Sequence, residues 1–406
     1  MVKITVAIIG CGTSGSAISA QIAKNEMFDT IMLIDSDAKK IKKLILELKN
    51  INDKGKYVSA TCDATKTKKI QNELKNVDVV INAASPLCNI SIMNGCLNSN
   101  THYIDLASDP FCYPGIDKKT TLDAQLKLDK KFKQNDLIAI TNTGFSPGFT
   151  DVICKHVAKQ FSLNSIESIK IYFAELIESE KFILSWSPYI FLLETIFQPT
   201  VYNKGKIVSL DPEKNSKIFS FPAPVGDIKI RPFNGHPELR TIPDFIGIPV
   251  EYIEISGGMR LNNMELNDII VESLRRKIQD SVVFNGDILS TLSSSFESPD
   301  KFAEYFKKGI IKKEIASCVI QIKGLKNHKI INYKAVLKHD LKDTISLMHT
   351  SVSAFFVSFV PSIIAHEIKL GTIKERGVIA PAALSIASHI ISECKKMGLN
   401  IKESYT

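Results

Sequence analysis

Apolar and polar positions follow two different patterns along the chain. Up to residue 145, short and continuous apolar runs alternate with stretches whose apolar residues recur at helical spacing. An uninterrupted apolar run is typical of a strand buried on both faces of a parallel sheet. The pattern predicts strands at 3–10, 30–37, 57–65, 78–85, 101–108 and 137–145, and helices at 14–25, 38–50, 89–99 and 118–134. This alternation indicates an α/β fold with a doubly wound parallel sheet.

The pattern changes after residue 148. One helix is predicted at 149–161, and the strand-like runs that follow are longer and farther apart. These runs are 165–176, 200–210, 251–259 and 314–337, the last interrupted by a polar turn at 326–329. Helices are predicted at 263–282, 286–294 and 299–308, and the chain from 341 onward is expected to be helical. We therefore expect an α+β domain with a mixed or antiparallel sheet over 148–340.

Composition excludes several classes of protein. The chain has 406 residues, of which 44% are hydrophobic and 23% charged, so it can bury a sizeable core. The net charge of +8 is spread over scattered lysines, which does not indicate nucleic-acid binding. The apolar stretches 182–197 and 351–368 are short for a membrane span and contain proline, so no membrane contact is expected. The eight cysteines form no CxxC pair, which favours a reducing cytoplasm and no metal site.

A glycine motif follows the first predicted strand directly. Gly10, Gly12 and Gly15 fit the pattern G-x-G-x-x-G, and a helix is predicted to begin at once. In a dinucleotide-binding turn the first glycine allows the bend, the second admits the pyrophosphate, and the third lets helix and strand pack closely. Thr13 and Ser14 would then present N–H groups to a phosphate at the helix N-terminus.

Asp35 lies 20 residues after the last of these glycines, at the end of the second predicted strand. A carboxylate at this place accepts hydrogen bonds from ribose hydroxyls and repels a 2′-phosphate, so NAD is expected and NADP is possible. The alternative is that Asp35 only caps the next helix. A bend of small residues between a strand and a helix would require no cofactor.

Five further segments together resemble the saccharopine dehydrogenase family, in order and in spacing. These are "DVVINAASPLCNISIMNGCLNSNTHYIDLASD", "TNTGFSPGFTDVICKHVAKQF", "LSWSPYIFLLE", "FNGHPELRTIPDF" and "LGTIKERGVIAP". The resemblance implies a Rossmann domain (1–147), an inserted α+β substrate and dimerisation domain (148–340), and a helical C-terminal segment (341–406) that returns to the Rossmann domain. It also implies a homodimer and hydride transfer at an amine- or imine-bearing carbon of an amino acid.

The sequence departs from some family members at three places. The second strand ends in "IDSD", where relatives that use NADP tend to carry serine or arginine. The segment before the helix at 149 reads "FSPG" rather than "DPG", and Ala382 stands where an acidic residue is usual. A saccharopine- or lysine-like substrate is expected. A carboxynorspermidine-type polyamine reductase and a non-catalytic nucleotide-binding sensor are the alternatives.

Strand ends supply the remaining residues expected near the cofactor, because ligands of open α/β sheets bind at the carboxyl ends of the strands. The resemblance places adenine near Cys62 and Asp63, whereas Asp63 could instead cap a helix. The other residues expected at the cofactor are Ala83, Ala84, Ser85, Ser146, Pro147 and Gly148. A turn before Pro86 explains the first three alternatively, and a plain helix start explains the last three.

Candidates for catalysis are Tyr103, Asp105 and His236. Tyr103 and Asp105 lie on the fifth predicted strand, where a carboxylate in a dry cleft could act as an acid or base, or could simply cap the strand end. His236 could donate a proton, although a loop histidine is commonly solvated. Candidates for substrate binding are Trp186, Glu194 and Arg240. Trp186 could equally be a core residue and Glu194 a half-exposed helix residue.

Overall fold

The computed structural model describes residues 4–108, 121–211, 214–266, 293–294 and 296–406. Within these ranges the chain forms two compact units. Unit 1 contains residues 4–108, 121–155 and 354–397, and unit 2 contains the described residues of 156–353 together with 398–406. The chain therefore changes unit inside α7 (Thr150–Gln160) and α13 (Val352–Val357) and again after α15 (Ala387–Lys396).

Unit 1 is built on a seven-stranded sheet whose strands are all parallel. The order is β3-β2-β1-β4-β5-β6-β16. Successive strands are added on one side of β1 up to β3 and on its other side from β4 onward, so the switch point lies between β1 and β4. The strands are β1 (Thr5–Ile9), β2 (Thr30–Asp35), β3 (Lys56–Thr61), β4 (Val79–Asn82), β5 (His102–Asp105), β6 (Ile138–Ile140) and β16 (Gly377–Ile379). The first six have the order of a dinucleotide-binding sheet. The predicted α/β class and its six N-terminal strands are thus confirmed.

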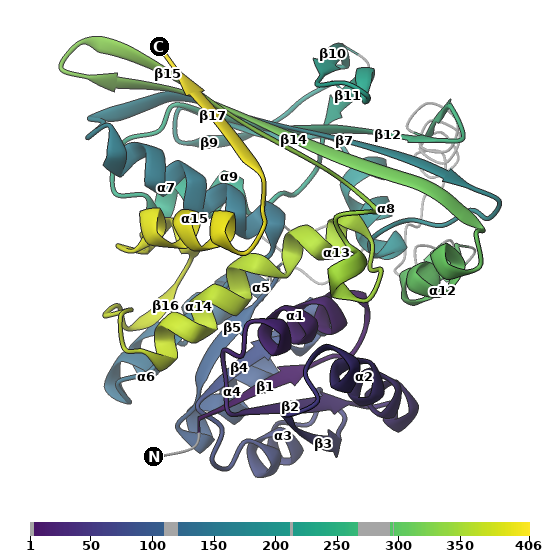
Figure 1. The fold of residues 1–406 in the computed structure, drawn as a ribbon. Helices are drawn as coiled ribbons and strands as arrows, with labels where there is room; N and C mark the ends of the chain where they lie inside the picture. The colour runs from purple at the N-terminus through teal and green to yellow at the C-terminus, as the bar shows by residue number, and fades with distance from the viewer. Residues whose placement is uncertain (1–3, 109–120, 212–213, 267–292, 295) are drawn as a thin grey trace, which may run out of the picture. The chain divides into compact units, whose positions relative to one another are not determined.

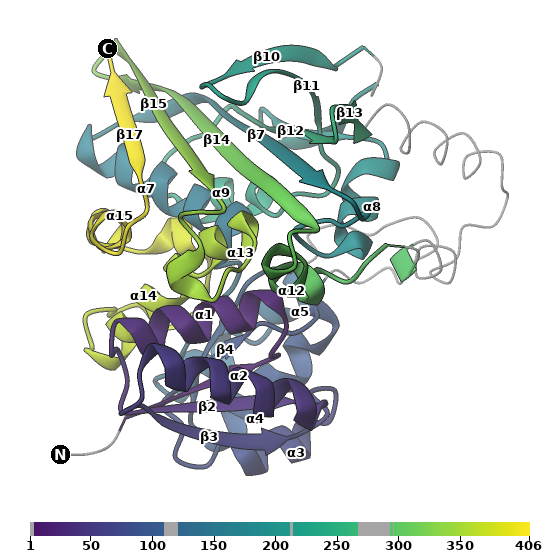
Figure 2. The same cartoon turned by 45° about the vertical axis from the view of Figure 1, so that its right-hand side comes forward.

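Helices cover both faces of this sheet, as Figures 1 and 2 show. The helix α1 packs against α2 and α14, while α3 packs against α4, and α4 against α5. The bounds are α1 (Thr13–Lys24), α2 (Ala38–Ile51), α3 (Thr67–Glu73), α4 (Asn89–Ser99), α5 (Thr121–Leu126), α6 (Asp129–Gln134), α14 (Phe359–Lys369) and α15 (Ala387–Lys396). The helix expected at 118–134 is therefore two short helices, and its first residues lie outside the described ones.

Unit 2 is built on a mixed sheet with the order β10-β11-β12-β7-β14-β15-β17. Its strands are β7 (Ser165–Ser179), β8 (Thr200–Asn203), β9 (Lys206–Ser209), β10 (Lys217–Phe221), β11 (Gly226–Pro232), β12 (Tyr252–Leu261), β13 (Met264–Glu265), β14 (Ile311–Lys326), β15 (Lys329–Asp340) and β17 (Ile401–Tyr405). The strands β7 and β12 run parallel, whereas β7, β14, β15 and β17 pair antiparallel. The expected mixed sheet and the turn between β14 and β15 are confirmed (Figure 2).

The described part of unit 2 also contains the helices α8 (Pro188–Ile196), α9 (Glu238–Phe245) and α12 (Phe302–Lys307), and it shares α7 (Thr150–Gln160) and α13 (Val352–Val357) with unit 1. The side chains of α8 pack into one apolar cluster with β7 and β12, with Phe191, Leu192 and Leu193 at its centre. Another cluster on the opposite side joins β10 and β11 to β7 and β14. The sheet thus carries a packed layer on each face.

Two expectations for unit 2 and the C-terminal segment were wrong. The helix expected from 263 does not begin there, because Met264 and Glu265 form β13, which pairs with β12. Most of that helix and of the one expected at 286–294 lies outside the described residues. The segment from 341 is not purely helical, since β16 pairs with β6 and β17 pairs with β15.

One helical stretch, Val352–Lys369, is long and apolar enough to cross a membrane by length and composition. It covers α13 (Val352–Val357) and α14, and 72% of it is buried inside the protein. Burial of this kind is typical of a core helix.

Candidate functional site

The glycine turn lies between β1 and α1 and requires glycine at two of its three positions. Gly10 has a φ of +96°, and a Cβ atom added there would lie 2.8 Å from backbone atoms of Ala83 and Ala84. A Cβ on Gly15 would lie 1.8 Å from the carbonyl oxygen of Gly10. Gly12 is the N-cap of α1, which begins at Thr13. The tight turn and the close packing of helix and strand are as the motif predicted.

Thr13 and Ser14 form the start of α1, where the backbone N–H groups have no helical acceptor. Cys11 lies between the glycines, and its thiol is buried. Burial, together with the nearby Asp35, raises the pKa of Cys11 to about 12. This thiol therefore stays protonated at neutral pH and is a poor nucleophile.

Asp35 is bound to the glycine turn. One carboxylate oxygen accepts the backbone N–H of Cys11 at 2.7 Å, and the other accepts the N–H of Asp37 at 2.9 Å. The N-cap of α2 is Asp37, whose side chain accepts the N–H of Lys39. The alternative interpretation of Asp35 as a helix cap was therefore wrong.

The third strand end is joined to the second. The N–H of Cys62 donates to the carbonyl oxygen of Asp35 at 2.9 Å, and the Cys62 side chain is buried. Asp63 accepts both the backbone N–H and the hydroxyl of Thr65, at 2.9 and 2.7 Å. These hydrogen bonds lower the pKa of Asp63. Asp63 does not cap the following helix, because the N-cap of α3 is Lys66.

The fourth strand end faces the glycine turn. The N–H of Ala83 donates to the carbonyl oxygen of Ile9 at 2.8 Å, and the N–H of Ala84 donates to the side chain of Asn82 at 3.0 Å. Ser85 caps the single turn of 3-10 helix Pro86–Cys88 by accepting the N–H of Leu87. These small residues thus lie close to Gly10 and begin a turn, which was the alternative that the sequence allowed. Their place at the cofactor stays a prediction.

This edge of unit 1 fits an adenine dinucleotide. It has a turn in which added Cβ atoms would collide with backbone, a helix N-terminus beside that turn, and a carboxylate fixed at the next strand end. These are the elements that hold the diphosphate and the ribose in Rossmann domains. Gly10, Gly12 and Gly15 would hold the diphosphate, and Asp35 would hold the adenine-side ribose.

Tyr103 and Asp105 are buried in unit 1. The Tyr103 hydroxyl accepts a hydrogen bond of 3.1 Å from Asn82, and its ring belongs to the apolar core. The Asp105 carboxylate accepts the backbone N–H of Asn142 at 2.8 Å and the side-chain amide of Gln125 at 2.5 Å. Burial raises the pKa of Asp105 to about 7, although these hydrogen bonds oppose the shift.

Ser146, Pro147 and Gly148 precede α7 and have non-helical backbone angles. They therefore do not form the helix start itself, since α7 begins at Thr150. Their place at the cofactor stays a prediction. Gly148 has a φ of +128°, and its N–H donates to the carboxylate of Asp151 in the first turn of the helix. The three residues form a bend before α7, and Asp151 in the first turn of that helix accepts a hydrogen bond from this bend.

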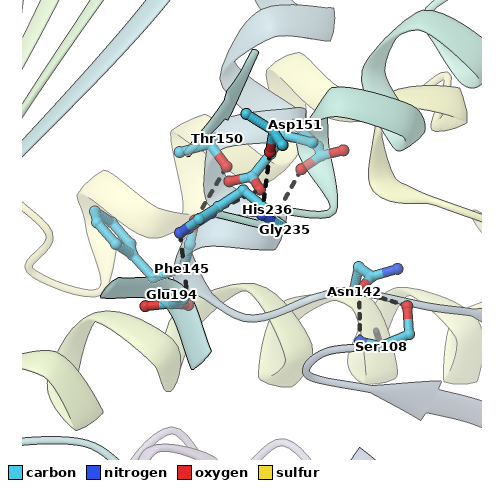
Figure 3. Close-up of polar contacts among 11 residues, drawn as sticks. Ser108, Asn142, Phe145, Thr150, Asp151, Glu194, Gly235 and His236 are labelled. Atoms are coloured by element: carbon cyan, nitrogen blue, oxygen red, sulfur yellow. Dashed lines mark hydrogen bonds and ion pairs between the residues drawn. The ribbon is translucent and has the colours of Figure 1, made fainter. Parts of the chain in front are cut away.

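His236 is the centre of a buried acidic cluster in unit 2. Its Nδ1 lies 3.1 Å from Oε2 of Glu238. Its Nε2 lies 3.5 Å from Oε1 of Glu194 (Figure 3). The ring stacks on Phe233 at 5.3 Å. Only 5% of His236 is exposed, so the alternative of a solvated loop histidine was wrong. Burial lowers the pKa of His236, but the two carboxylates outweigh it and the net shift is upward.

The three residues expected to bind substrate all lie in unit 2. Trp186 is partly buried, contacts Phe191 edge-on at 6.0 Å and borders the apolar cluster of α8. Glu194 is on α8 and is partly exposed, while Arg240 is on α9 and is partly buried. Trp186 therefore has a core contact, as its alternative stated, and Glu194 has the ion pair described above.

Sequence reasoning missed a second pair of acids on the sheet of unit 2. Glu175 on β7 and Glu314 on β14 are both buried. Glu175 pairs with Ala316, and Glu314 is two residues before Ala316 on the same strand, so the two glutamates lie on the same face of the sheet. Burial raises the pKa of both carboxyls, and the charge of Glu175 raises that of Glu314 further. Both oxygens of Glu314 accept the N–H of Val352, at 3.0 and 2.9 Å. The available signal was a glutamate inside an apolar strand.

Comparisons with known proteins agree with this arrangement. Residues 6–140 match the saccharopine dehydrogenase NADP binding domain, and residues 144–399 match the saccharopine dehydrogenase C-terminal domain. Carboxynorspermidine synthase of Vibrio cholerae is 28% identical over 260 residues, 62% of this chain and 61% of that protein. Carboxyaminopropylagmatine dehydrogenase of Synechocystis is 23% identical over 229 residues, 55% of this chain and 54% of that protein. The matches thus span less than two thirds of these relatives.

Two solved structures share the fold along nearly the whole chain. The apo saccharopine dehydrogenase (L-Glu forming) of Saccharomyces cerevisiae has a TM-score of 0.69 at 17% identity, over 99% of this chain and 100% of that one. The homospermidine synthase of Legionella pneumophila in complex with NAD has a TM-score of 0.64 at 14% identity, over 100% of this chain and 93% of that one. With both domain models matched in order, the chain belongs to the saccharopine dehydrogenase family of NAD(P)-binding oxidoreductases.

Proposed function

We propose that this protein is an NAD(P)-dependent reductase that joins a diamine to an amino-acid aldehyde through a secondary amine. One amino group of the diamine and the aldehyde carbon condense to an imine with loss of water. The imine carbon then gains a hydride and its nitrogen gains a proton, which yields the secondary amine and the oxidised cofactor. The reverse reaction is the corresponding dehydrogenation. The proposal extends the carboxynorspermidine-type alternative of the sequence and is supported by the names of the relatives that the chain matches.

The observation that carries this proposal is the acidic surrounding of His236. Glu194 and Glu238 lie within 3.5 Å of its two ring nitrogens. Hydrogen bonds between ammonium groups and carboxylates are among the strongest in proteins, so such a site favours a substrate with several amino groups. Trp186 adds an aromatic face that attracts a cation.

The chemistry divides between the cofactor and the chain. A bound nicotinamide supplies the hydride or accepts it. His236 holds a proton between two carboxylates, which makes it the group best suited to protonate the imine or amine nitrogen. Glu194 is the partly exposed member of the cluster and would hold a substrate ammonium group. Both ligands must be bound at once, so the reaction requires a ternary complex.

For the cofactor we propose NAD rather than NADP. Asp35 is fixed at the end of β2 by its two backbone hydrogen bonds, so its negative charge cannot easily turn away. A carboxylate there repels the 2′-phosphate of NADP. The matched domain model is described as an NADP binding domain, so the two cofactors must be compared directly on this protein.

The second candidate substrate is a saccharopine- or lysine-like amino acid. Arg231 is a buried cation on β11 and Arg240 is a partly buried one on α9. Guanidinium groups bind carboxylates in a two-point geometry, so these residues suit a substrate with more than one carboxylate. The acid-rich cluster at His236 favours the diamine over this candidate.

The test is the oxidation of NADH and of NADPH, followed at 340 nm with purified protein. The substrates are an amino-acid semialdehyde combined with diamines of three to five carbons, the same aldehyde combined with glutamate, and saccharopine or lysine in the oxidative direction. We expect turnover with aldehyde plus diamine and at least a tenfold lower kcat/KM with the glutamate combination. Turnover with saccharopine or lysine alone would select the second candidate.

A matched pair of variants connects the activity to the cluster. Glu194→Gln is expected to raise KM for the diamine at least tenfold, because it removes one charge beside His236. The control is Glu178→Gln, an exposed glutamate of β7 that forms an ion pair with Lys313. Binding of NADH without turnover of any combination would favour the non-catalytic sensor and overturn the proposal.

A further inference from the structure

Buried polar side chains form a continuous chain through unit 1 that no part of the proposed function uses. Asp105 accepts the amide of Gln125, and the oxygen of that amide accepts a 3.3 Å hydrogen bond from Asn89. Asn89 in turn accepts a 2.8 Å hydrogen bond from Asn82. The side-chain oxygen of Asn82 accepts the N–H of Ala84, beside the glycine turn. The chain thus begins at the end of β5 and ends at the end of β4.

Asp105 also ties together the two loops that follow β5 and β6. Its Oδ1 accepts the N–H of Asn142, and its own carbonyl oxygen accepts the N–H and the hydroxyl of Thr143, at 2.8 and 2.7 Å. The side chain of Asn142 then accepts the N–H and the hydroxyl of Ser108, at 2.8 and 2.9 Å (Figure 3). Asn142 has a φ of +61°, so a left-handed backbone presents its side chain to the other loop.

These loops belong to the second half of the dinucleotide-binding sheet. In such sheets one half, built on β1 to β3, holds the adenine nucleotide, and the other half, built on β4 to β6, holds the second nucleotide. The glycine turn and Asp35 are in the first half. Asp105 and Asn142 are in the second half, at the carboxyl ends where ligands bind.

We infer that Asp105 is a positioning residue that shapes the nicotinamide side of the cofactor site through Asn142 and Ser108. Asp105 itself is 1% exposed and therefore does not touch the cofactor or the substrate. This replaces the acid or base role expected for it from sequence. The inference depends on the cofactor-binding domain and not on the proposed substrate, so it is tested without any substrate.

The experiment compares two ligands on the full-length protein by calorimetry. NADH occupies both halves of the site, whereas ADP-ribose lacks the nicotinamide ring. For Asp105→Leu we expect the Kd for NADH to rise at least tenfold, while the Kd for ADP-ribose changes less than twofold. Asp105→Asn keeps one acceptor oxygen and is expected to lose less than a third of that effect on a logarithmic scale.

Two further variants keep the inference falsifiable if Asp105→Leu does not fold. Asn142→Gly retains the left-handed backbone and its N–H but removes the bonds to Ser108, so it should also weaken NADH selectively. The control is Asp78→Asn at the amino edge of the same sheet, where Asp78 accepts the N–H of Thr5. This control should change neither Kd. Equal weakening of both ligands by Asn142→Gly or Asp105→Asn, or no weakening of NADH, would overturn the inference.

Discussion

The carboxylate of Asp35 accepts the backbone N–H of Cys11 at 2.7 Å, so the acid at the end of β2 is fixed directly to the glycine turn. The same side chain accepts the N–H of Asp37. Because both carboxylate oxygens have a backbone donor, the charge is held at one place at the edge of the sheet. That place is where a dinucleotide-binding domain distinguishes a ribose hydroxyl from a phosphate.

Replacing Asp35 is therefore expected to change the choice of cofactor. In Asp35→Asn the charge is lost, and the ratio of Kd for NADP to Kd for NAD should fall about tenfold, which corresponds to about 1.4 kcal/mol. The measurement is a fluorescence titration with NADH and NADPH. The matched control is Asp37→Asn, which alters the cap of α2 and should leave the ratio unchanged. An equal ratio in wild type and Asp35→Asn would contradict the role of this charge.

Two glycine substitutions distinguish the effect of a steric collision in the glycine turn from the effect of backbone strain elsewhere. Gly15→Ala introduces a Cβ 1.8 Å from the carbonyl oxygen of Gly10, so helix and strand must separate, and NADH affinity should fall more than tenfold. Gly371→Ala is the comparison, because Gly371 has a φ of +65° but open space around it. It should lower the melting temperature slightly without affecting the cofactor. Retention of NADH affinity by Gly15→Ala would show that no diphosphate binds at this turn.

His236 should make the protein less stable at alkaline pH. Although burial lowers its pKa, Glu238 and Glu194 raise it more, so the folded pKa lies above the unfolded value near 6.5. The resulting stability is fully present below the unfolded pKa and is lost as the pH rises through the folded one. In Glu238→Gln the NMR titration of His236 should move to lower pH. A titration that stays in place would show that this carboxylate does not hold the proton.

Asp105 should add a pH dependence of its own. Its folded pKa of about 7 lies above the usual aspartate value of 3.8, so the folded state binds an extra proton between these two pH values. The stability from this group is present below pH 3.8 and is lost as the pH rises through about 7. Melting temperatures of wild type and Asp105→Asn between pH 4.5 and 8 test this, since the variant should lack that part of the slope. Parallel curves would show that Asp105 is ionised throughout.

Most of unit 1 could be predicted from the sequence because most of its strands are buried on both faces; β3, at the sheet edge, is largely exposed. The run from Val6 to Ile9 is apolar without interruption. Gly10 and Gly15 follow it at the spacing of the motif, and a Cβ atom at either position would collide with backbone atoms. The short helix α3 was missed, because seven residues with one buried apolar side chain give no periodic signal. The strands β16 and β17 were not predicted within the C-terminal segment. Each is short and pairs at a sheet edge with a strand that is distant in sequence, β6 for β16 and β15 for β17.

The cofactor edge was predictable to a greater extent than the acidic cluster. Asp35 has a fixed spacing from the glycine motif, whereas the partners of His236 come from α8 and α9, more than 40 residues apart. No spacing rule relates Glu194 to His236, so only the folded chain shows that they form an ion pair. Asp105 was selected from the sequence for its place at a strand end. Its burial and its hydrogen bond from Asn142 appear only in the folded chain, and they are the basis for inferring a positioning role.

The path of the chain limits how this protein can be divided. Because the polypeptide leaves unit 1 within α7, re-enters it within α13, and contributes β17 to unit 2 after α15, neither unit is a single contiguous segment. One cut cannot separate unit 1 from unit 2, and exchange of unit 2 for that of another protein with the same chain path would need three junctions. Shortening the chain after residue 397 would remove an edge strand from the sheet of unit 2 while leaving the sheet of unit 1 complete.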